Sequence, residues 1–359
     1  MFFEEHAKLL SDFSRISKAA GARADYVQGG GGNTSVKLPG GLMAIKASGF
    51  CLSDIAPDRA YAVLDCVDLK DFYLGSEPSD FENVEQTGSA RAKADVRHID
   101  GLADLRPSVE AGFHSILSTF VLHTHSVYAN LAACSTACRD IAEQAFEGAN
   151  YTWGWVPYTD PGANLTFAIR DELRRVEEKT GKIPSVILMQ NHGIIVHDDN
   201  PNRCLAIHTD ANARLAGLFG LTATAFPEVT VQEMAGGFYA AGTPYLAKVL
   251  RDGGYTQEFL MTQPLYPDQM VFLTDSFSMD RRGIPEGQTV ASTKTGQMLL
   301  NMEEKKALTL TQTLTAVFFV MEHIKAAGYE VSTMGEAAKH FISSWESEKY
   351  RKSLSGKQA

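Results

Sequence analysis

The chain has 359 residues, of which 44% are hydrophobic and 21% charged, a balance that is ordinary for a soluble globular enzyme. Its formal net charge of -10 argues against a nucleic-acid partner and against binding to an anionic membrane, because both recognise a basic surface. The first residues predict no signal peptide and no stretch approaches the roughly 20 apolar residues of a spanning helix, so we expect a cytoplasmic protein.

The five cysteines are an odd number, and they stand in apolar or ordinary surroundings at Cys51, Cys66, Cys134, Cys138 and Cys204. Two of them, Cys134 and Cys138, are four residues apart on an expected helix, where a pair of thiolates could bind a metal. No second cysteine pair accompanies them, so we favour buried thiols in a reducing compartment.

The first part of the chain predicts a helix, a glycine-rich turn and a hairpin. Residues 4–20 space their apolar side chains helically, and Gly21 is a suitable C-cap. The cluster Gly29–Gly32 follows, and residues 36–48 read as two short strands separated by Pro-Gly-Gly. Residues 60–69 predict a further strand.

The middle of the chain alternates helices with strands. Residues 106–117 predict a helix with Ser108 as its N-cap, residues 119–125 a strand, and residues 126–134 a helix. A helix, two apolar runs and another helix follow, at residues 163–181, 185–199 and 201–221. We therefore predict an α/β fold, a three-layer α/β/α sandwich with a mixed, largely antiparallel central sheet.

The apolar pattern weakens over residues 230–245, where we place a domain boundary. Beyond it we expect strands at residues 270–274 and 296–302, a long helix at residues 303–327, and a final helix that ends in the sequence EKYRKSL. The expected organisation is an N-terminal domain, a smaller C-terminal α/β lobe and a disordered polar tail, at residues 1–235, 245–352 and 353–359.

Two histidines separated by one residue, His123 and His125, end one of the predicted strands. Residues two apart on a strand point to the same face, so both imidazoles could bind one metal ion at about 2.0–2.1 Å. Two half-exposed histidines at a strand end are an equally good interpretation of this pair considered by itself.

A third histidine, His192, interrupts two apolar runs within the sequence Gln-Asn-His-Gly. A buried histidine there needs a polar partner or a metal, and Gly193 allows close approach of the backbone. Considered alone, His192 is better explained as a hydrogen-bonded core residue. Together with His123 and His125 it completes the three imidazoles that a catalytic zinc site with an open position uses.

Glu110 and a set of small polar residues are further candidates. Glu110 stands at a predicted helix start, where it could simply favour the positive end of the helix, or could move a proton beside a metal. Glycine-rich turns at Gly32-Asn33 and Ser48-Gly49 expose N–H groups that can bind phosphate, and the helix start at Ser108 adds donors. A flexible turn without a ligand explains the glycines equally simply.

Taken in order, six segments resemble the class II aldolase/adducin family, over roughly residues 5 to 220: GGGGNTSVK, IKASGF, RPSVEAGFH, VLHTHSVYANLA, VPYTDPGANL and MQNHGIIVHDD. The HxH and NHG elements, found in this order with the other segments, are specific for the family because they would rarely coincide by chance. The PSVE form and the long C-terminal part look more like the aldolase half of bacterial rhamnulose-phosphate aldolase/dehydrogenase fusions than like the short fuculose-phosphate aldolases.

The resemblance implies roles for particular residues. His123, His125 and His192 match the zinc ligands, and Glu110 matches the catalytic acid/base. The positions that bind the substrate phosphate in the family are matched by Gly32, Asn33, Ser48, Gly49 and Ser108. Val109 departs from the serine that most short members carry, so one phosphate donor is missing or replaced.

The reaction implied by the resemblance is retro-aldol cleavage of a ketose 1-phosphate to dihydroxyacetone phosphate and a small aldehyde, in a homo-oligomer, a tetramer with active sites near subunit interfaces. The same scaffold serves pentulose-phosphate 4-epimerases and adducins, which are binding proteins of the cytoskeleton. The histidine trio and Glu110 favour an enzyme over a binding module, whereas aldolase and epimerase remain open alternatives.

Overall fold

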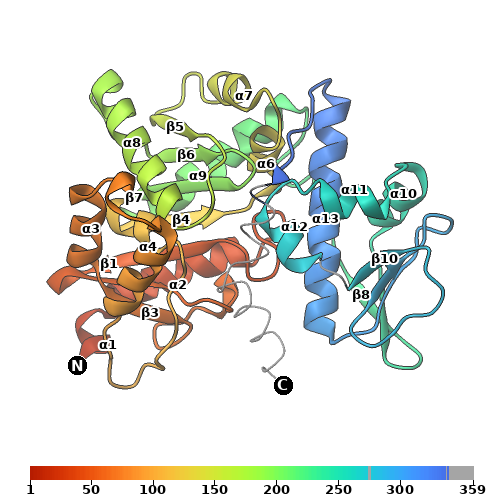
Figure 1. The fold of residues 1–359 in the computed structure, drawn as a ribbon, viewed down its shortest axis with the longest axis horizontal. Coiled ribbons are helices and arrows are strands. Elements are labelled where there is room, and N and C mark those ends of the chain that lie inside the picture. The colour runs from red at the N-terminus through yellow and green to blue at the C-terminus, as the bar shows by residue number, and fades with distance from the viewer. Residues whose placement is uncertain (274–275, 337, 339–359) are drawn as a thin grey trace.

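The computed structural model describes residues 1–273, 276–336 and 338, and within them the strands form two sheets (Figure 1). The larger sheet has seven strands in the order β3-β2-β1-β4-β7-β6-β5. Its strands are β1 (Asn33–Leu38), β2 (Leu42–Lys46), β3 (Tyr61–Asp65), β4 (Phe120–Thr124), β5 (Trp153–Val156), β6 (Val186–Met189) and β7 (Gly193–Asp198). The β5–β6 pair is parallel and the other pairs are antiparallel, which confirms the predicted mixed sheet.

Helices cover both faces of this sheet. The helices of this part are α1 (Phe2–Glu5), α2 (Ala7–Gly21), α3 (Cys66–Gly75), α4 (Val84–Ala94), α5 (Ala111–Ile116), α6 (Val127–Ala133), α7 (Cys138–Ala145), α8 (Ala163–Thr180) and α9 (Pro201–Leu218). Alternate residues of β4 divide the core, because Phe120 and Leu122 pack with α2 and α9 whereas Val121 packs with α5 and α8. The result is the expected three-layer sandwich.

The second sheet has five strands in the order β10-β11-β12-β9-β8. Its strands are β8 (Val231–Met234), β9 (Phe238–Ala241), β10 (Phe277–Met279), β11 (Thr289–Ala291) and β12 (Met298–Leu300). The helices of this part are α10 (Pro244–Asp252), α11 (Gln257–Thr262), α12 (Pro267–Phe272) and α13 (Glu304–Ala326). This confirms a second α/β region, while the exact division into residues 1–235 and 245–352 stays a prediction.

Helix α13 joins the two regions. It lies between the seven-stranded sheet with its helices and the smaller sheet (Figure 1), and its apolar residues share one core cluster with Val127, Tyr128 and Leu131 of α6. Its 23 residues are long and apolar enough to cross a membrane, contrary to the expectation from the sequence. However, 72% of its most apolar window is buried inside the protein, so its apolar surface serves packing.

Three predicted elements were wrong in type or position. Residues 270–274 were expected as a strand, but α12 occupies Pro267–Phe272, because a short apolar run does not distinguish a strand from a buried helix. The strand predicted at 60–69 ends at Asp65, whose side chain caps α3. Helix α5 begins at Ala111 with Glu110 as its N-cap, so Ser108 is not the cap that the sequence predicted.

Other predictions hold. The hairpin of β1 and β2 is present, and Gly181 ends α8 in the left-handed conformation with a φ of 71°. Cys134 and Cys138 are buried, as expected, and burial raises the pKa of the Cys138 thiol to about 12, which favours inert thiols over metal ligands. The final helix ending in EKYRKSL and the tail 353–359 lie outside the described residues.

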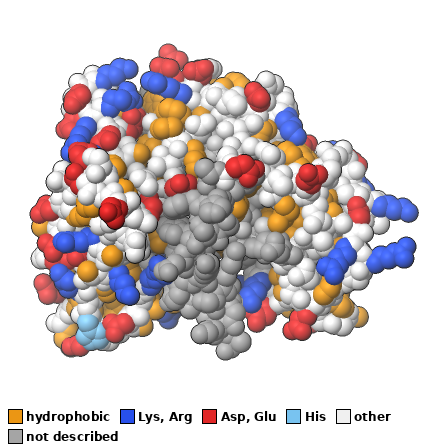
Figure 2. Space-filling view, in the orientation of Figure 1, with side chains coloured by type: hydrophobic (Ala, Val, Ile, Leu, Met, Phe, Trp, Pro, Cys, Tyr) orange, Lys and Arg blue, Asp and Glu red, His pale blue; other side chains and the backbone are white. Residues whose placement is uncertain are grey.

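The outer surface mixes both signs of charge. Figure 2 shows acidic and basic side chains interspersed with polar and apolar ones over the visible face. This distribution accompanies the formal net charge of -10.

Two glycines let the backbone of neighbouring loops approach the end of β4. A Cβ at Gly32, where φ is 64°, would lie 2.6 Å from the carbonyl oxygen of His123. A Cβ at Gly193 would lie 2.3 Å from the carbonyl oxygen of Thr124. Side chains at either position would separate strands that pair with β4, so these glycines have a structural reason to be there.

We predict that Gly32→Ala destabilises the fold more than Gly40→Ala. Gly40 also has a positive φ, 79°, but a Cβ there meets no atom within 4 Å, so its replacement carries backbone strain alone, about 1–2 kcal/mol. Gly32→Ala adds the clash with His123. Urea unfolding of both variants measures the difference, and equal losses of unfolding free energy would show that the close approach is unimportant.

Candidate metal centre

Three histidines from the end of β4 and from the turn before β7 converge at one end of the large sheet. His123 lies near the end of β4, His125 follows that strand, and His192 lies in the short turn between β6 and β7. Strands β4 and β7 pair with Thr124 opposite Ile194, which brings the end of β4 beside the start of β7. One nitrogen from each of the three imidazoles lies within 4.8 Å of the others.

The hydrogen bonds of two histidines determine which ring nitrogen carries the proton. Nδ1 of His123 is 3.0 Å from the carbonyl oxygen of Ile194, and Nδ1 of His125 is 2.5 Å from Oδ2 of Asp268. A carbonyl or carboxylate oxygen accepts, so each Nδ1–H donates and each Nε2 carries a lone pair. The two Nε2 atoms face each other at 3.1 Å, an arrangement that a shared cation would satisfy.

All three ligand candidates are buried, and burial keeps His123 in the form that binds metal. His123, His125 and His192 are at most 5% exposed. Burial lowers the pKa of His123 to about 4, despite the opposing effect of Glu110, so this imidazole is neutral at pH 7. A neutral His123, with two further buried histidines whose ring nitrogens gather at the same point, fits a divalent metal such as zinc.

Glu110 lies directly against this trio. Its Oε1 is 3.3 Å from Nε2 of His192, and its Oε2 is 3.7 Å from Nε2 of His123. Burial alone would raise the pKa of this carboxyl, but the charge that the surrounding histidines carry when protonated and a hydrogen bond from Asn33 lower it to about 2. The side chain is therefore a carboxylate at neutral pH, within reach of anything that binds between the histidines.

Asn33 links Glu110 to the small polar residues. Its Nδ2 donates to Oε2 of Glu110 at 2.6 Å and to Oγ of Ser108 at 3.2 Å. Its Oδ1 accepts from Nε2 of His114, whose Nδ1 is 2.7 Å from Oγ of Ser35. Each group in this chain is buried and has a partner, so Asn33 is held in one orientation by residues behind it.

His114 is a site residue that the sequence reasoning missed. It is fully buried, and burial lowers its pKa well below the usual value, so it is a neutral donor to Asn33. A signal was present, because His114 stands four residues after Glu110 on the same predicted helix, and residues four apart lie on one face.

The remaining candidates lie in two adjacent segments. Ala47 forms an isolated β-bridge with Pro107, and the N–H of Ser48 donates to the carbonyl oxygen of Arg106, so the Ser48-Gly49 turn lies beside the segment that carries Ser108. Oγ of Ser48 is buried and has no hydrogen-bond partner among the described residues. No hydrogen bond within the described part of the chain joins Ser48 or Gly49 to the histidines.

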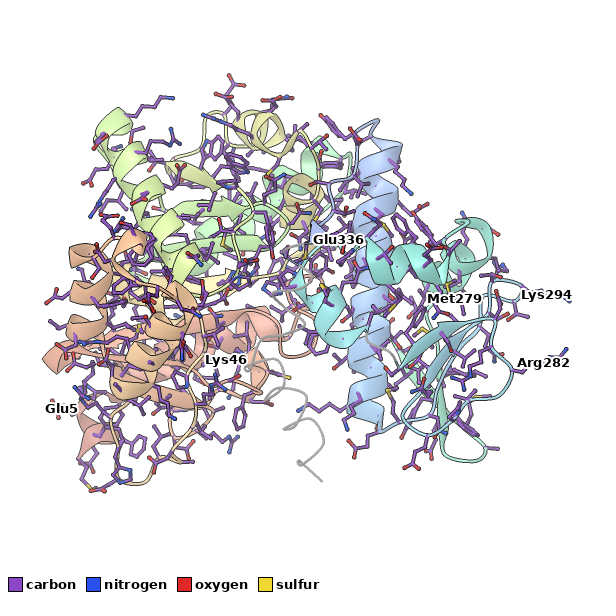
Figure 3. The ribbon with its side chains drawn as sticks, viewed as in Figure 1. Glu5, Lys46, Met279, Arg282, Lys294 and Glu336 are labelled. Atoms are coloured by element: carbon purple, nitrogen blue, oxygen red, sulfur yellow. The ribbon has the colours of Figure 1, made fainter. Side chains whose placement is uncertain are left out.

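Lys46 brings a cation to these turns. Its side chain is 1% exposed, and its Nζ donates to the carbonyl oxygen of Phe50 at 2.8 Å and to that of Gly30 at 3.2 Å. Figure 3 marks Lys46 toward the middle of the molecule. Val109, in contrast, contributes no polar side chain.

We predict that His123→Ala abolishes stoichiometric metal binding, because two imidazoles hold zinc far more weakly than three. His98→Ala is the matched control, since His98 is an exposed histidine bonded to Asp104 and distant in sequence from the trio. Elemental analysis of protein purified without chelators should give near one metal per chain for the wild type and the control. Full metal content in His123→Ala would show that the ion binds elsewhere.

Several solved structures are distantly similar to this chain. Among solved structures, the N-terminal class II aldolase domain of a conserved protein from Thermoplasma acidophilum is 20% identical, with 57% of this chain and 91% of that chain covered and a TM-score of 0.47. YgbL from Klebsiella pneumoniae, a putative aldolase/epimerase/decarboxylase by its description, is 19% identical, with coverages of 60% and 91% and a TM-score of 0.40.

The l-fuculose-1-phosphate aldolase from Thermus thermophilus is 13% identical, with 60% of this chain and 95% of that chain covered and a TM-score of 0.37. None of the curated proteins matches the chain. Residues 13–211, more than half of the 359 residues, match the family model described as the class II aldolase and adducin N-terminal domain. The chain therefore belongs to the class II aldolase and adducin N-terminal domain family.

Proposed function

We propose that the protein is a zinc-dependent class II aldolase that cleaves a ketose 1-phosphate to dihydroxyacetone phosphate and a small aldehyde. The observation that carries this proposal is the buried trio His123, His125 and His192 with the Glu110 carboxylate against it. A binding module has no need of a buried carboxylate beside three buried histidines, because such a group is costly to bury without a function or a counter-charge.

In the proposed reaction the metal and the protein side chains have different roles. Zinc, when bound, supplies a Lewis acid for the ketose carbonyl. In cleavage the carbon–carbon bond breaks, its electron pair stays on the carbon next to that carbonyl, and the hydroxyl on the aldehyde side loses its proton. The Glu110 carboxylate takes up the proton that the hydroxyl releases and delivers it to that carbon, and in the reverse condensation it removes the proton from the carbon and returns it to the oxygen. No net proton is consumed.

The residues behind Glu110 orient it for this transfer. Asn33 donates to Oε2 of Glu110, and His114 donates to Asn33, so the carboxylate has little rotational freedom. Oε1 lies 3.3 Å from Nε2 of His192 and receives no hydrogen bond within the described part of the chain, which leaves that oxygen the freer of the two for a proton. This arrangement favours proton transfer by one oxygen in a fixed position.

The polar groups of the turns beside the Ser108 segment support a substrate that has an anionic end. The unpartnered hydroxyl of Ser48 and the Lys46 ammonium lie in the turns that match the phosphate-binding segments of the family. Gly32, Asn33, Gly49 and Ser108 complete the proposed set. Helix α5, with six residues, is too short to contribute a helix N-terminus of the kind expected from the sequence, so we assign the binding to side chains and loop N–H groups.

Several finer features are proposals of the same kind. The PSVE sequence and the second α/β region point to the aldolase half of rhamnulose-phosphate aldolase/dehydrogenase fusions as the nearest functional type. We also infer a cytoplasmic homotetramer, and a monomer in sedimentation experiments would count against that assembly. A pentulose-phosphate 4-epimerase is the second candidate, because it needs the same metal and polar groups.

We predict that Glu110→Gln slows turnover by about two to four orders of magnitude while metal content and fold are unchanged, because the amide cannot exchange the proton. The assay incubates zinc-loaded protein with ketose 1-phosphates and follows released dihydroxyacetone phosphate with a coupled dehydrogenase. An unchanged rate would remove Glu110 from the mechanism. Conversion of a pentulose phosphate to its 4-epimer without released fragments would instead establish the epimerase.

We predict that Ser48→Ala raises the KM for the ketose phosphate roughly ten- to hundredfold, because a hydrogen bond to a charged group is worth about 1.5–3 kcal/mol. Ser53→Ala, an exposed serine in the following turn, is the matched control and should leave the KM unchanged. The wild type should prefer the phosphate over the free ketose, and Ser48→Ala should discriminate less. Equal use of both substrates by the wild type would refute the phosphate assignment.

A further inference from the structure

One of the metal-ligand candidates is held by a residue from outside the family-matched part of the chain. Asp268 lies in α12, beyond residues 13–211, and its Oδ2 is 2.5 Å from Nδ1 of His125. Asp268 is 0% exposed. Because the carboxylate accepts the Nδ1 proton, the other nitrogen of His125 must present its lone pair toward His123.

The glycine loop is shaped around this carboxylate. A Cβ at Gly31 would lie 2.4 Å from Oδ2 of Asp268, so any other residue would push the carboxylate away from His125. Oδ1 of Asp268 is buried and has no hydrogen-bond partner among residues 1–273, 276–336 and 338. A carboxylate buried with a single partner stabilises a fold poorly, since the loss of hydration outweighs one hydrogen bond. The position of Asp268 is better explained by a role in orienting His125.

Neighbouring side chains hold the segment that carries Asp268. Gln269 accepts from the N–H of Leu265 at 2.9 Å and donates to the carbonyl oxygen of Leu260 at 2.8 Å. These two bonds connect α12 with the end of α11 and fix the turn between them. Asp268 therefore reaches His125 from a backbone that is itself held in place, as a positioning group requires.

The same segment also fixes the residue before the third histidine. Asn191 has a φ of 51°, and its Nδ2 donates to the carbonyl oxygens of Leu265 at 2.8 Å and Ser332 at 2.9 Å. Oγ of Ser332 donates to Oδ1 of Asn191 at 3.0 Å. A non-glycine residue in this conformation persists only where its surroundings hold it, and here the C-terminal part provides that restraint.

We propose that Asp268 is a positioning residue for the metal ligand His125, and that the C-terminal part of the chain thereby completes the metal site. The inference rests on the proposed metal-dependent function. Carboxylates that bind the distal nitrogen of a metal-ligating histidine fix its ring and increase its basicity, and their loss typically costs about 10–100-fold in metal affinity. A purely structural contact between the two parts would affect stability and leave metal affinity unchanged.

The test measures zinc affinity of the full-length protein by competition with a chromophoric chelator. Asp268→Ala should bind zinc about 10–100-fold more weakly than the wild type. Asp268→Asn, which keeps an acceptor oxygen and the shape but loses the charge, should restore part of the affinity. Glu258→Gln, the removal of an exposed carboxylate in α11, is the matched control for charge and should bind as the wild type does.

Thermal unfolding of the chelator-treated proteins separates positioning from stability, because the wild type and Asp268→Asn should unfold at similar temperatures without metal. Wild-type zinc affinity in folded Asp268→Ala would overturn the inference. If the alanine variant does not fold, wild-type affinity in Asp268→Asn overturns it equally. A wild type that binds no zinc would instead refute the metal site, and with it both the proposed function and the role of Asp268.

Discussion

The antiparallel pairing of β4 with β7 is the interaction on which the site depends. With Thr124 opposite Ile194, the end of one strand and the start of the next present histidines to the same space. A register slip of one residue would turn His123 toward the opposite face of the sheet, where α9 packs. The close approaches at Gly32 and Gly193 keep the neighbouring backbone near enough to preserve that register.

Charge compensation explains why the buried groups occur together. Three buried histidines face two buried carboxylates, those of Glu110 and Asp268, within one dry region. Without a counter-charge this arrangement would be costly, because buried negative groups lose their hydration. A divalent cation between the imidazoles would balance both carboxylates, and would also give Glu110 its place beside the reacting carbon. The same ion would therefore meet the electrostatic need and the proposed chemistry.

Local sequence patterns predicted the parts of the site that lie within single segments. The HxH spacing and the Asn-His-Gly turn pointed to His123, His125 and His192, and the strand and helix periods gave the layers of the large sheet. The prediction failed where structure depends on distant contacts. Nothing near His125 in sequence indicates Asp268, and α12 was mistaken for a strand because its short apolar run fits either structure. The Ser108 cap failed because Glu110 occupies that position.

The central claim is that three histidines and a carboxylate from the C-terminal part form one metal site. A crystal structure of the zinc-loaded protein, with anomalous scattering recorded at the zinc edge, tests it most directly. The account predicts one strong peak about 2.0–2.1 Å from Nε2 of His123 and His125 and from one ring nitrogen of His192, with Asp268 still bonded to Nδ1 of His125. A peak away from these histidines, or none in protein shown to contain zinc, would contradict it.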